Sequence, residues 1–316
     1  MTWTEHAAGA PSKGAQAGWS RRRAWHWGAG RLRETKAFTG DATLESEVLL
    51  RSVAAISREE FFTRPEAALP PAAVAAYSAL IARRAAGVPT AYLVGHREFF
   101  GLDLAVDARV LVPRPETECL VEAVVEALRR RRDPLVVDIG TGSGAIAIAL
   151  AHALPRARLL ATDISCAALD VARKNAERCG VGHRITWHAG PGLEPLRRSM
   201  AEGGVDALAC NPPYIPSDAV AALAEEVRGW EPRIALDGGP DGLDLHRTIA
   251  AGAARYLAAG GMLAMEVAAL WDQAHVVAGL IAATGAFGPV RVIRDSAGAE
   301  RVVVAERNSG RGDRRG

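Results

Sequence analysis

The sequence predicts an α/β protein in which a mainly parallel sheet follows a small helical domain. From residue 135 onward, short apolar segments with strand character alternate with longer helical segments, the order that builds a parallel sheet. Before residue 88, apolar residues instead recur at helical spacing. With 316 residues, the chain is long enough for one full α/β domain and a smaller one.

Along the chain we expect five segments. They are a disordered extension (1–18), a helical substrate-docking domain (19–87), a β-hairpin linker (88–118), the sheet domain (119–307) and a disordered tail (308–316).

Within the helical domain, residues 19–33 hold three tryptophans among arginines. This pattern indicates a short amphipathic helix with buried rings, although an arginine/tryptophan anchor for nucleic acid or membrane is an alternative. Apolar spacing predicts a second helix over 44–56. A third, over 71–86, is opened by prolines and ended by Gly87.

The linker predicts a short strand about 104–106, and Pro115 suits the first turn of a helix running to about residue 132. Arginines at 129–132 are then a solvated helix end that complements the helix dipole. In the sheet domain the strands are expected over 135–139, 158–162, 184–188, 205–210, 262–267, 290–294 and 301–305, with helices over 145–154, 165–179, 244–257 and 270–284. The hairpin-type connection at 295–299 makes the last strand antiparallel.

Composition argues against several classes of protein. The formal net charge of +2 is too small to indicate a polyelectrolyte partner. We expect no membrane span and no signal peptide, and therefore a cytoplasmic protein. Four cysteines at wide, irregular spacings lack a metal-ligand pattern and indicate free thiols in a reducing compartment.

A glycine-rich turn, Gly140-Thr141-Gly142-Ser143-Gly144, follows the strand at 135–139 and opens a helix. Such a turn brings backbone N–H groups close to a ligand. The next strand ends at Asp163, where a carboxylate can accept both ribose hydroxyls of an adenosine group. The glycine spacing differs from that of dinucleotide sites, so a nucleoside with a compact tail, such as S-adenosylmethionine, is favoured over a pyrophosphate. A tight turn without a ligand is the alternative.

A second motif, Asn211-Pro212-Pro213-Tyr214, ends the apolar strand at 205–210. The two prolines fix φ and force extended geometry, which makes a stiff bracket. It holds the Asn211 amide and the carbonyls of Asn211 and Pro212 at a strand's carboxyl end, where open α/β sheets bind ligands. Rigid acceptors beside an aromatic ring suit a planar NH₂ group, and a proline-rich turn is the alternative.

Together with further motifs, these residues resemble the HemK/PrmC family of class I S-adenosylmethionine-dependent methyltransferases. The further motifs are Pro89-x-x-Tyr92-x-x-Gly95, Glu98-Phe99-x-Gly101-Leu102, Pro113-Arg114-Pro115-Glu116-Thr117-Glu118, Asp241-Gly242-Leu243-Asp244 and Arg294-Asp295. The resemblance implies a Rossmann-like, seven-stranded sheet. It also implies methylation of the side-chain amide of the glutamine in the Gly-Gly-Gln motif of class I peptide chain release factors, by a monomer that needs no nucleic acid, membrane or metal.

The resemblance also assigns site residues. Catalytic roles fall to Asn211, Pro212 and Tyr214. Cofactor binding falls to Gly140, Thr141, Gly142, Ser143, Gly144, Asp163, Pro191 and Asn211. Substrate binding falls to Asn211, Pro212, Pro213, Tyr214 and Phe100.

Three positions depart from the family pattern. Ala189-Gly190-Pro191 lacks the acidic residue that usually frames adenine, so adenine must either be recognised in another way or be bound less tightly. Glu266-Val267-Ala268 replaces a usual Glu-Ile-Gly or Glu-His-Gly, and Glu45-Ser46-Glu47 replaces Asp-Ala-Glu.

Three other functions compete with this reading. A ribosomal-protein glutamine methyltransferase shares most of the motifs. A methyltransferase acting on adenine in nucleic acid has the same Asn-Pro-Pro-Tyr motif, but the chain lacks a large recognition domain and a strong basic balance. A non-catalytic docking protein would fit the departure at Gly190, although the intact motifs argue against it.

Overall fold

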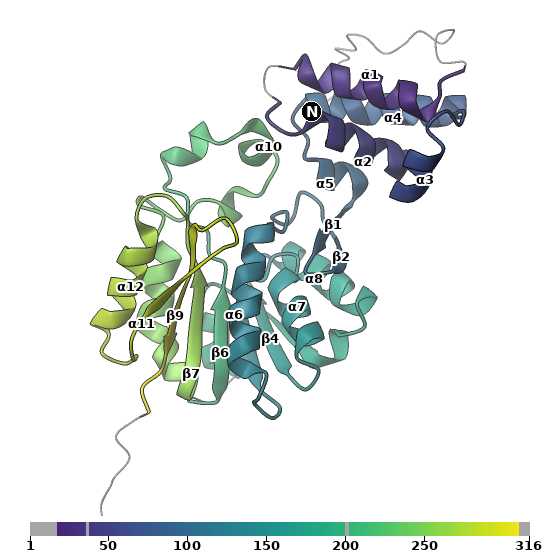
Figure 1. Ribbon diagram of the computed structural model, residues 1–316. Helices are drawn as coiled ribbons and strands as arrows, with labels where there is room; N and C mark the ends of the chain where they lie inside the picture. The colour runs from purple at the N-terminus through teal and green to yellow at the C-terminus, as the bar shows by residue number, and fades with distance from the viewer. Residues whose placement is uncertain (1–17, 36–37, 200–201, 310–316) are drawn as a thin grey trace, which may run out of the picture. The chain divides into compact units, whose positions relative to one another are not determined.

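The computed structural model describes residues 18–35, 38–199 and 202–309 (Figure 1). The extension expected over 1–18 and the tail expected over 308–316 lie outside these residues, apart from residues 18, 308 and 309. The chain divides into two compact units. One contains residues up to 95 together with 224–230, and the other contains 96–223 and 231 onward.

The first unit is helical. Its helices are α1 (Arg21–Arg33), α2 (Ala42–Ala54), α3 (Arg58–Thr63), α4 (Pro71–Ala85), α5 (Thr90–Val94) and α10 (Glu225–Arg228). The predicted helices over 19–33, 44–56 and 71–86 are confirmed to within two residues at each end, and α3 and α5 were not predicted. Trp19 and Trp27 meet edge to face with ring centroids 5.4 Å apart, and Trp19 is buried. The tryptophan-rich helix therefore turns rings inward, as an amphipathic core helix does.

The segment 224–230 belongs to this helical unit although it comes from the second half of the chain. Arg84 of α4 is only 3% exposed and forms ion pairs with Glu45 of α2 and Glu226 of α10. The ring of Phe38 lies 4.7 Å from the Arg84 guanidinium. A buried guanidinium between two carboxylates and an aromatic face holds the segment in place.

The second unit contains a hairpin and a seven-stranded sheet. The hairpin is β1 (His96–Phe99) with β2 (Leu102–Ala105). The sheet order is β5-β4-β3-β6-β7-β9-β8. The strands of the sheet are β3 (Leu135–Ile139), β4 (Arg158–Asp163), β5 (Ile185–Ala189), β6 (Val205–Cys210), β7 (Leu257–Glu266), β8 (Arg291–Arg294) and β9 (Glu300–Glu306). Strands β3 to β7 run parallel, and β9 is antiparallel to both β7 and β8, which confirms the expected antiparallel last strand.

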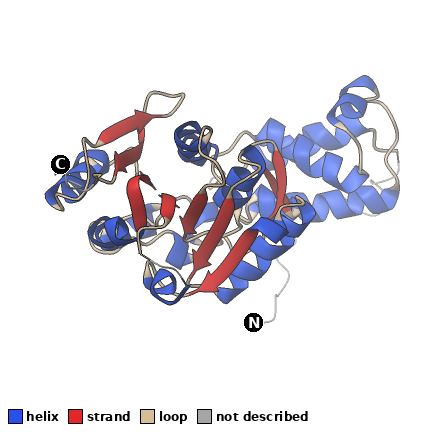
Figure 2. Cartoon of the chain, turned by 90° about the horizontal axis from the view of Figure 1, so that it is seen from below, coloured by secondary structure: helices blue, strands red, loops and turns tan. Residues whose placement is uncertain are grey.

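Helices cover both faces of this sheet (Figure 2). They are α6 (Glu118–Leu128), α7 (Ala145–Ala153), α8 (Cys166–Arg178), α9 (Glu194–Ser199), α11 (Asp244–Tyr256) and α12 (Gln273–Ala283). Val136 packs with α6 and α7, while its neighbour Val137 packs with α11 and α12. Since successive strand residues point to opposite faces, an apolar run without alternation builds two cores at once.

Helix α6 ends at Leu128, so the prediction that it runs to about 132 is wrong. Beyond it, Arg131 donates to the carboxylate of Asp206 at 3.1 Å and to the carbonyl of Gly260 at 3.1 Å. Asp133 then takes a φ of 50°, in the left-handed region. These contacts tie the chain to β6 and β7 and turn it toward β3. A longer α6 would prevent this turn.

Two other boundaries move for local reasons. Strand β7 begins at Leu257, five residues before the predicted start, and its pairing with β6 shifts register between Val205 and Ala207. Helix α12 begins at Gln273, three residues after the predicted start, because Trp271 and Asp272 have φ values of 62° and 53°. Within the described ranges, the protein contains no helix of the length and apolarity that crossing a bilayer requires. Cys119, Cys166, Cys179 and Cys210 are free thiols.

Candidate active site

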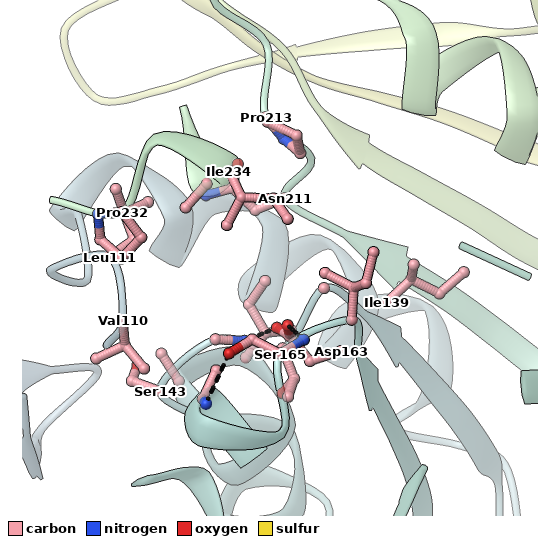
Figure 3. Close-up of a pocket in the computed structure, with 18 of the residues that line it drawn as sticks. Val110, Leu111, Ile139, Ser143, Asp163, Ser165, Asn211, Pro213, Pro232 and Ile234 are labelled. Carbon is pink, nitrogen blue, oxygen red and sulfur yellow. Dashed lines mark hydrogen bonds between the residues drawn. The ribbon is translucent and has the colours of Figure 1, made fainter. Parts of the chain in front are cut away.

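A cavity of about 310 Å³ opens in the sheet unit, at the carboxyl ends of β3, β4 and β6. Strand β3 lies between β4 and β6, so the sheet order reverses there, which is where open α/β sheets bind ligands. Figure 3 shows Asp163 and Ser165 on one side of the cavity and Asn211, Pro213 and Ile234 on the opposite side. The volume falls at the lower end of the range for small-molecule sites.

The glycine turn forms one wall. Gly140 and Gly142 have φ values of 70° and 55°, and a Cβ at either position would meet nothing within 4 Å. At Gly144, a Cβ would lie 2.8 Å from Ile148 and 3.1 Å from Ala172. Gly144 is therefore needed for helix packing and does not line the cavity, whereas Gly140, Thr141, Gly142 and Ser143 do.

Asp163, the last residue of β4, holds the neighbouring backbone in place. Its Oδ2 accepts a hydrogen bond from the Gly142 N–H at 2.9 Å, and its Oδ1 accepts one from the Ser165 N–H at 2.8 Å. Burial raises the pKa of Asp163, and these backbone donors act in the opposite direction. The carboxylate thus ties the glycine turn to the β4–α8 turn while it lines the cavity.

Asp138 lies beneath the glycine turn rather than in the cavity. Its Oδ2 accepts hydrogen bonds from the Thr141 hydroxyl at 2.6 Å and the Ala147 N–H at 3.2 Å. Burial raises the pKa of Asp138 to about 7. These contacts give the carboxyl a supporting position, in which it shapes the turn from below.

The Asn-Pro-Pro-Tyr bracket forms the opposite wall, where Asn211 and Pro213 line the cavity. The Asn211 Nδ2 donates to Thr117 Oγ1 at 3.1 Å. Because the nitrogen end of the amide is used in this way, the oxygen end remains as an acceptor. Pro212 and Tyr214 do not line the cavity.

Tyr214 is held by its backbone. Its carbonyl accepts a hydrogen bond from Gln273 Nε2 at 2.7 Å, and Gln273 Oε1 accepts one from the Ala268 N–H at 3.0 Å. Gln273 is buried, so it joins the end of the bracket firmly to the loop after β7. Burial raises the pKa of Tyr214 to about 12, so the phenol stays protonated near neutral pH.

Phe100 also lies outside the cavity lining, and its neighbour Phe99 takes that place. Pro191 lines the cavity as expected from the sequence, and so does Gly190. The Gly190 N–H donates to the Asp163 carbonyl at 2.9 Å, and Gly190 has a φ of 149°. A Cβ there would lie 2.9 Å from Pro195, so the backbone leaves no room for a side chain.

Sequence reasoning missed a third wall, formed by Val110, Leu111, Pro232 and Ile234. Glu231 joins its two segments, because its Oε2 accepts from the Val112 N–H at 3.1 Å and its Oε1 pairs with Arg114 at 2.5 Å. The apolar run at 110–112, just before the Pro113 motif, was the available signal. Ile234 is 57% exposed beside the cavity, and no pattern in the sequence identifies it as a cavity residue.

No described residues form a group of three or more histidine, cysteine, aspartate or glutamate side chains suited to a metal ion.

Comparison with known families matches two models. Residues 23–95 match the PrmC N-terminal domain, and residues 116–227 match the methyltransferase small domain. The first match falls in the helical unit, and the second spans the glycine turn, Asp163 and the bracket.

Relatives match over most of the chain. A release factor glutamine methyltransferase from Moorella thermoacetica is 48% identical over 264 residues, covering 84% of this chain and 91% of the relative. One from Geobacter sulfurreducens is 41% identical over 286 residues, covering 90% and 96%. A solved release-factor-specific protein-(glutamine-N5) methyltransferase from Alicyclobacillus acidocaldarius is 31% identical, covering 62% of this chain and 94% of that one, with a TM-score of 0.39. The chain therefore belongs to the release factor glutamine methyltransferase family.

Proposed function

We propose that this protein transfers the methyl group of S-adenosylmethionine to the side-chain amide nitrogen of the glutamine in the Gly-Gly-Gln motif of class I peptide chain release factors. The observation that carries the proposal is the hydrogen bond from Asn211 Nδ2 to Thr117. It leaves the Asn211 oxygen as a fixed acceptor at the cavity wall, which matches the N–H groups of a glutamine amide.

The opposite wall fits S-adenosylmethionine. Open space over Gly140 and Gly142 lets a ligand approach the backbone, and the Asp163 carboxylate suits ribose hydroxyls. The apolar side chain of Ile164 follows Asp163, lines the cavity and is 52% exposed, so it offers a surface for an adenine ring. Such contacts replace the acidic residue that the chain lacks at Gly190.

When bound, S-adenosylmethionine supplies an already activated methyl group. The difficulty lies in the nucleophile, because an amide nitrogen delocalises its lone pair into the carbonyl. We assign Asn211 Oδ1, which lines the cavity, as an acceptor for one N–H group of the amide, which would turn the lone pair toward the methyl carbon. Phe99 and Pro213, which line the cavity, are proposed to pack on the amide and its alkyl stem and exclude water, in the place expected for Phe100 and Tyr214. No general base is needed before transfer, since the methylated, positively charged amide is a strong acid.

A direct assay tests the proposal. Purified protein and radiolabelled S-adenosylmethionine are mixed with a class I release factor, or with the same factor carrying Gln→Ala in its Gly-Gly-Gln motif. We expect label on the glutamine of the first factor only. Label on ribosomal proteins but not on the release factor would instead support the ribosomal-protein alternative, and no transfer to either would contradict the proposal.

A further inference from the structure

The Pro113-to-Glu118 motif connects three parts of the sheet unit that surround the substrate side of the cavity. Arg114 pairs with Glu231 in the third wall, Thr117 accepts from Asn211, and Glu118 accepts from the backbone of Phe100. The motif lies at the start of α6, and Thr117 is buried. Of its members, Thr117 has the direct contact with the bracket.

Thr117 lies between Asn211 and a buried carboxyl. Cys210 pairs with Met265 in the parallel register of β6 and β7, so Asn211 and Glu266 follow at the same level of the sheet. Glu266 is fully buried, and the Thr117 side chain faces its carboxylate. Among the described residues, neither Glu266 oxygen has a partner at full hydrogen-bond geometry, so the hydroxyl is near without closing an ideal bond.

Because Thr117 lies between Glu266 and Asn211, Glu266 sets the direction of the hydrogen bond between Thr117 and Asn211. Glu266 offers an acceptor oxygen to the Thr117 hydroxyl whether its carboxyl group is ionised or protonated, so we infer that the hydroxyl directs its proton toward Glu266. Its oxygen then accepts, and an acceptor selects the NH₂ end of the Asn211 amide. A hydroxyl with no such neighbour could donate equally well to the amide oxygen. The amide would then turn its NH₂ group to the cavity, where it would oppose the N–H groups of a bound glutamine.

We propose that Thr117 is a positioning residue that, backed by Glu266, fixes the Asn211 amide with its oxygen toward the substrate. The proposal rests on the proposed function for the identity of the substrate, but the orientation of the amide is a property of the free protein. Thr117 itself touches neither the methyl donor nor the reacting nitrogen. Its effect must therefore pass through Asn211.

The first experiment measures the free protein. Hydrogen exchange of the Asn211 side-chain NH₂ is followed by NMR in ¹⁵N-labelled full-length protein, assigned with Asn211→Ala. We expect at least one slowly exchanging Nδ2 proton, and roughly tenfold faster exchange in Thr117→Val, which keeps the shape of the side chain and removes its hydroxyl. Rapid exchange in the wild-type protein would overturn the proposal, and this readout needs no substrate.

The second experiment measures single-turnover methyl transfer to the release factor. Thr117→Val should lower the rate roughly 10- to 100-fold while S-adenosylmethionine affinity stays unchanged, and Thr117→Ser should stay within about threefold of wild type. In an Asn211→Ala background, Thr117→Val should have almost no further effect. A wild-type rate in Thr117→Val, equal losses in the serine and valine variants, or a full extra loss in the Asn211→Ala background would each contradict the proposal.

The two experiments separate two kinds of failure. If the wild-type protein protects the Asn211 amide but does not methylate the release factor, the proposed function fails and the orientation by Thr117 stands. If methylation proceeds and the amide is unprotected, the reverse holds.

Discussion

The backbone N–H of Phe100 donates to Glu118 Oε1 at 3.0 Å, which joins the β1–β2 turn to the first turn of α6. Phe100 and Gly101 have φ values of 51° and 74°, as the two central residues of a tight hairpin turn require. A phenylalanine pays a steric cost in this conformation, so the contact with Glu118 stabilises a strained residue.

Removing this contact should lower stability. We expect Glu118→Ala to reduce the free energy of unfolding by about 1–2 kcal/mol, because the N–H of the half-buried Phe100 loses its acceptor. Glu118→Gln keeps an acceptor oxygen and should lose less than half of that. Urea denaturation of both variants checks the ranking, and equal losses would show that the charge rather than the hydrogen bond is important.

Asp163→Ala should weaken S-adenosylmethionine binding by about 1–3 kcal/mol, because ribose hydroxyls lose a charged acceptor. The same change removes the acceptor of the Gly142 N–H, so the glycine turn also loses support. Asp163→Asn keeps one acceptor oxygen and should bind with intermediate affinity. Calorimetry that finds unchanged affinity in the alanine variant would exclude Asp163 from the cofactor site.

Gly190→Asp would restore the acidic residue that the family usually carries, but we expect it to weaken cofactor binding. At a φ of 149°, with a Cβ 2.9 Å from Pro195, any side chain must move the loop that holds Pro191 in the cavity wall. Gly190→Ala, which adds no charge, is the matched control and should also bind less tightly. Tighter binding by the aspartate variant would show that the loop adapts at low cost.

Asn211→Ala should act on the rate of transfer. The two prolines preserve the backbone path, so the fold should survive, and the lost acceptor matters most when the lone pair turns toward the methyl group. By analogy with a lost oxyanion-hole donor, we expect a decrease of about 10²–10³ in single-turnover rate. Cofactor affinity, measured in parallel, should change little. Asn211→Asp keeps an acceptor oxygen and adds a negative charge near the sulfonium. It therefore distinguishes the effect of charge from the effect of a lost acceptor.

Burial raises the pKa of Glu266 from 4.5 to about 7, and this makes stability depend on pH. Between these values the folded protein binds the proton more tightly than the unfolded chain does. The free energy of unfolding therefore falls as pH rises from about 4.5 to 7, by about 3 kcal/mol from this group.

Glu266→Gln should flatten that part of the profile of unfolding free energy against pH. Asp138, raised from 3.8 to about 7, contributes in the same direction, so a residual slope should remain until Asp138→Asn is added. A profile in the Glu266→Gln variant as steep as that of wild type would show that Glu266 ionises normally.

The sequence predicts the strands of the sheet better than the ends of the helices. Strands β3 and β6 match their predicted bounds, because strands buried on both faces are continuous apolar runs. The end of α6 depends instead on contacts of Arg131 with residues far along the chain, and no local pattern records them.

The same distinction applies to the cavity. Gly142, Asp163 and Asn211 follow strands at the carboxyl edge of the sheet, so strand order brings them together and the sequence predicts their proximity. Ile234 and Val110 reach the cavity from long connections, and their place depends on tertiary contacts such as those of Glu231. Thr117 was part of a recognised motif, but its partner Asn211 is 94 residues away.

The helical unit is not a continuous stretch of sequence, since 224–230 completes it. The chain therefore passes between the two units three times, after residues 95, 223 and 230. A cassette exchange that replaced residues 1–95 with those of a relative would leave Glu226 facing a foreign partner in place of Arg84. The helical unit is therefore encoded in two distant parts of the gene, and a chimera should fold well only when both are taken from the same parent.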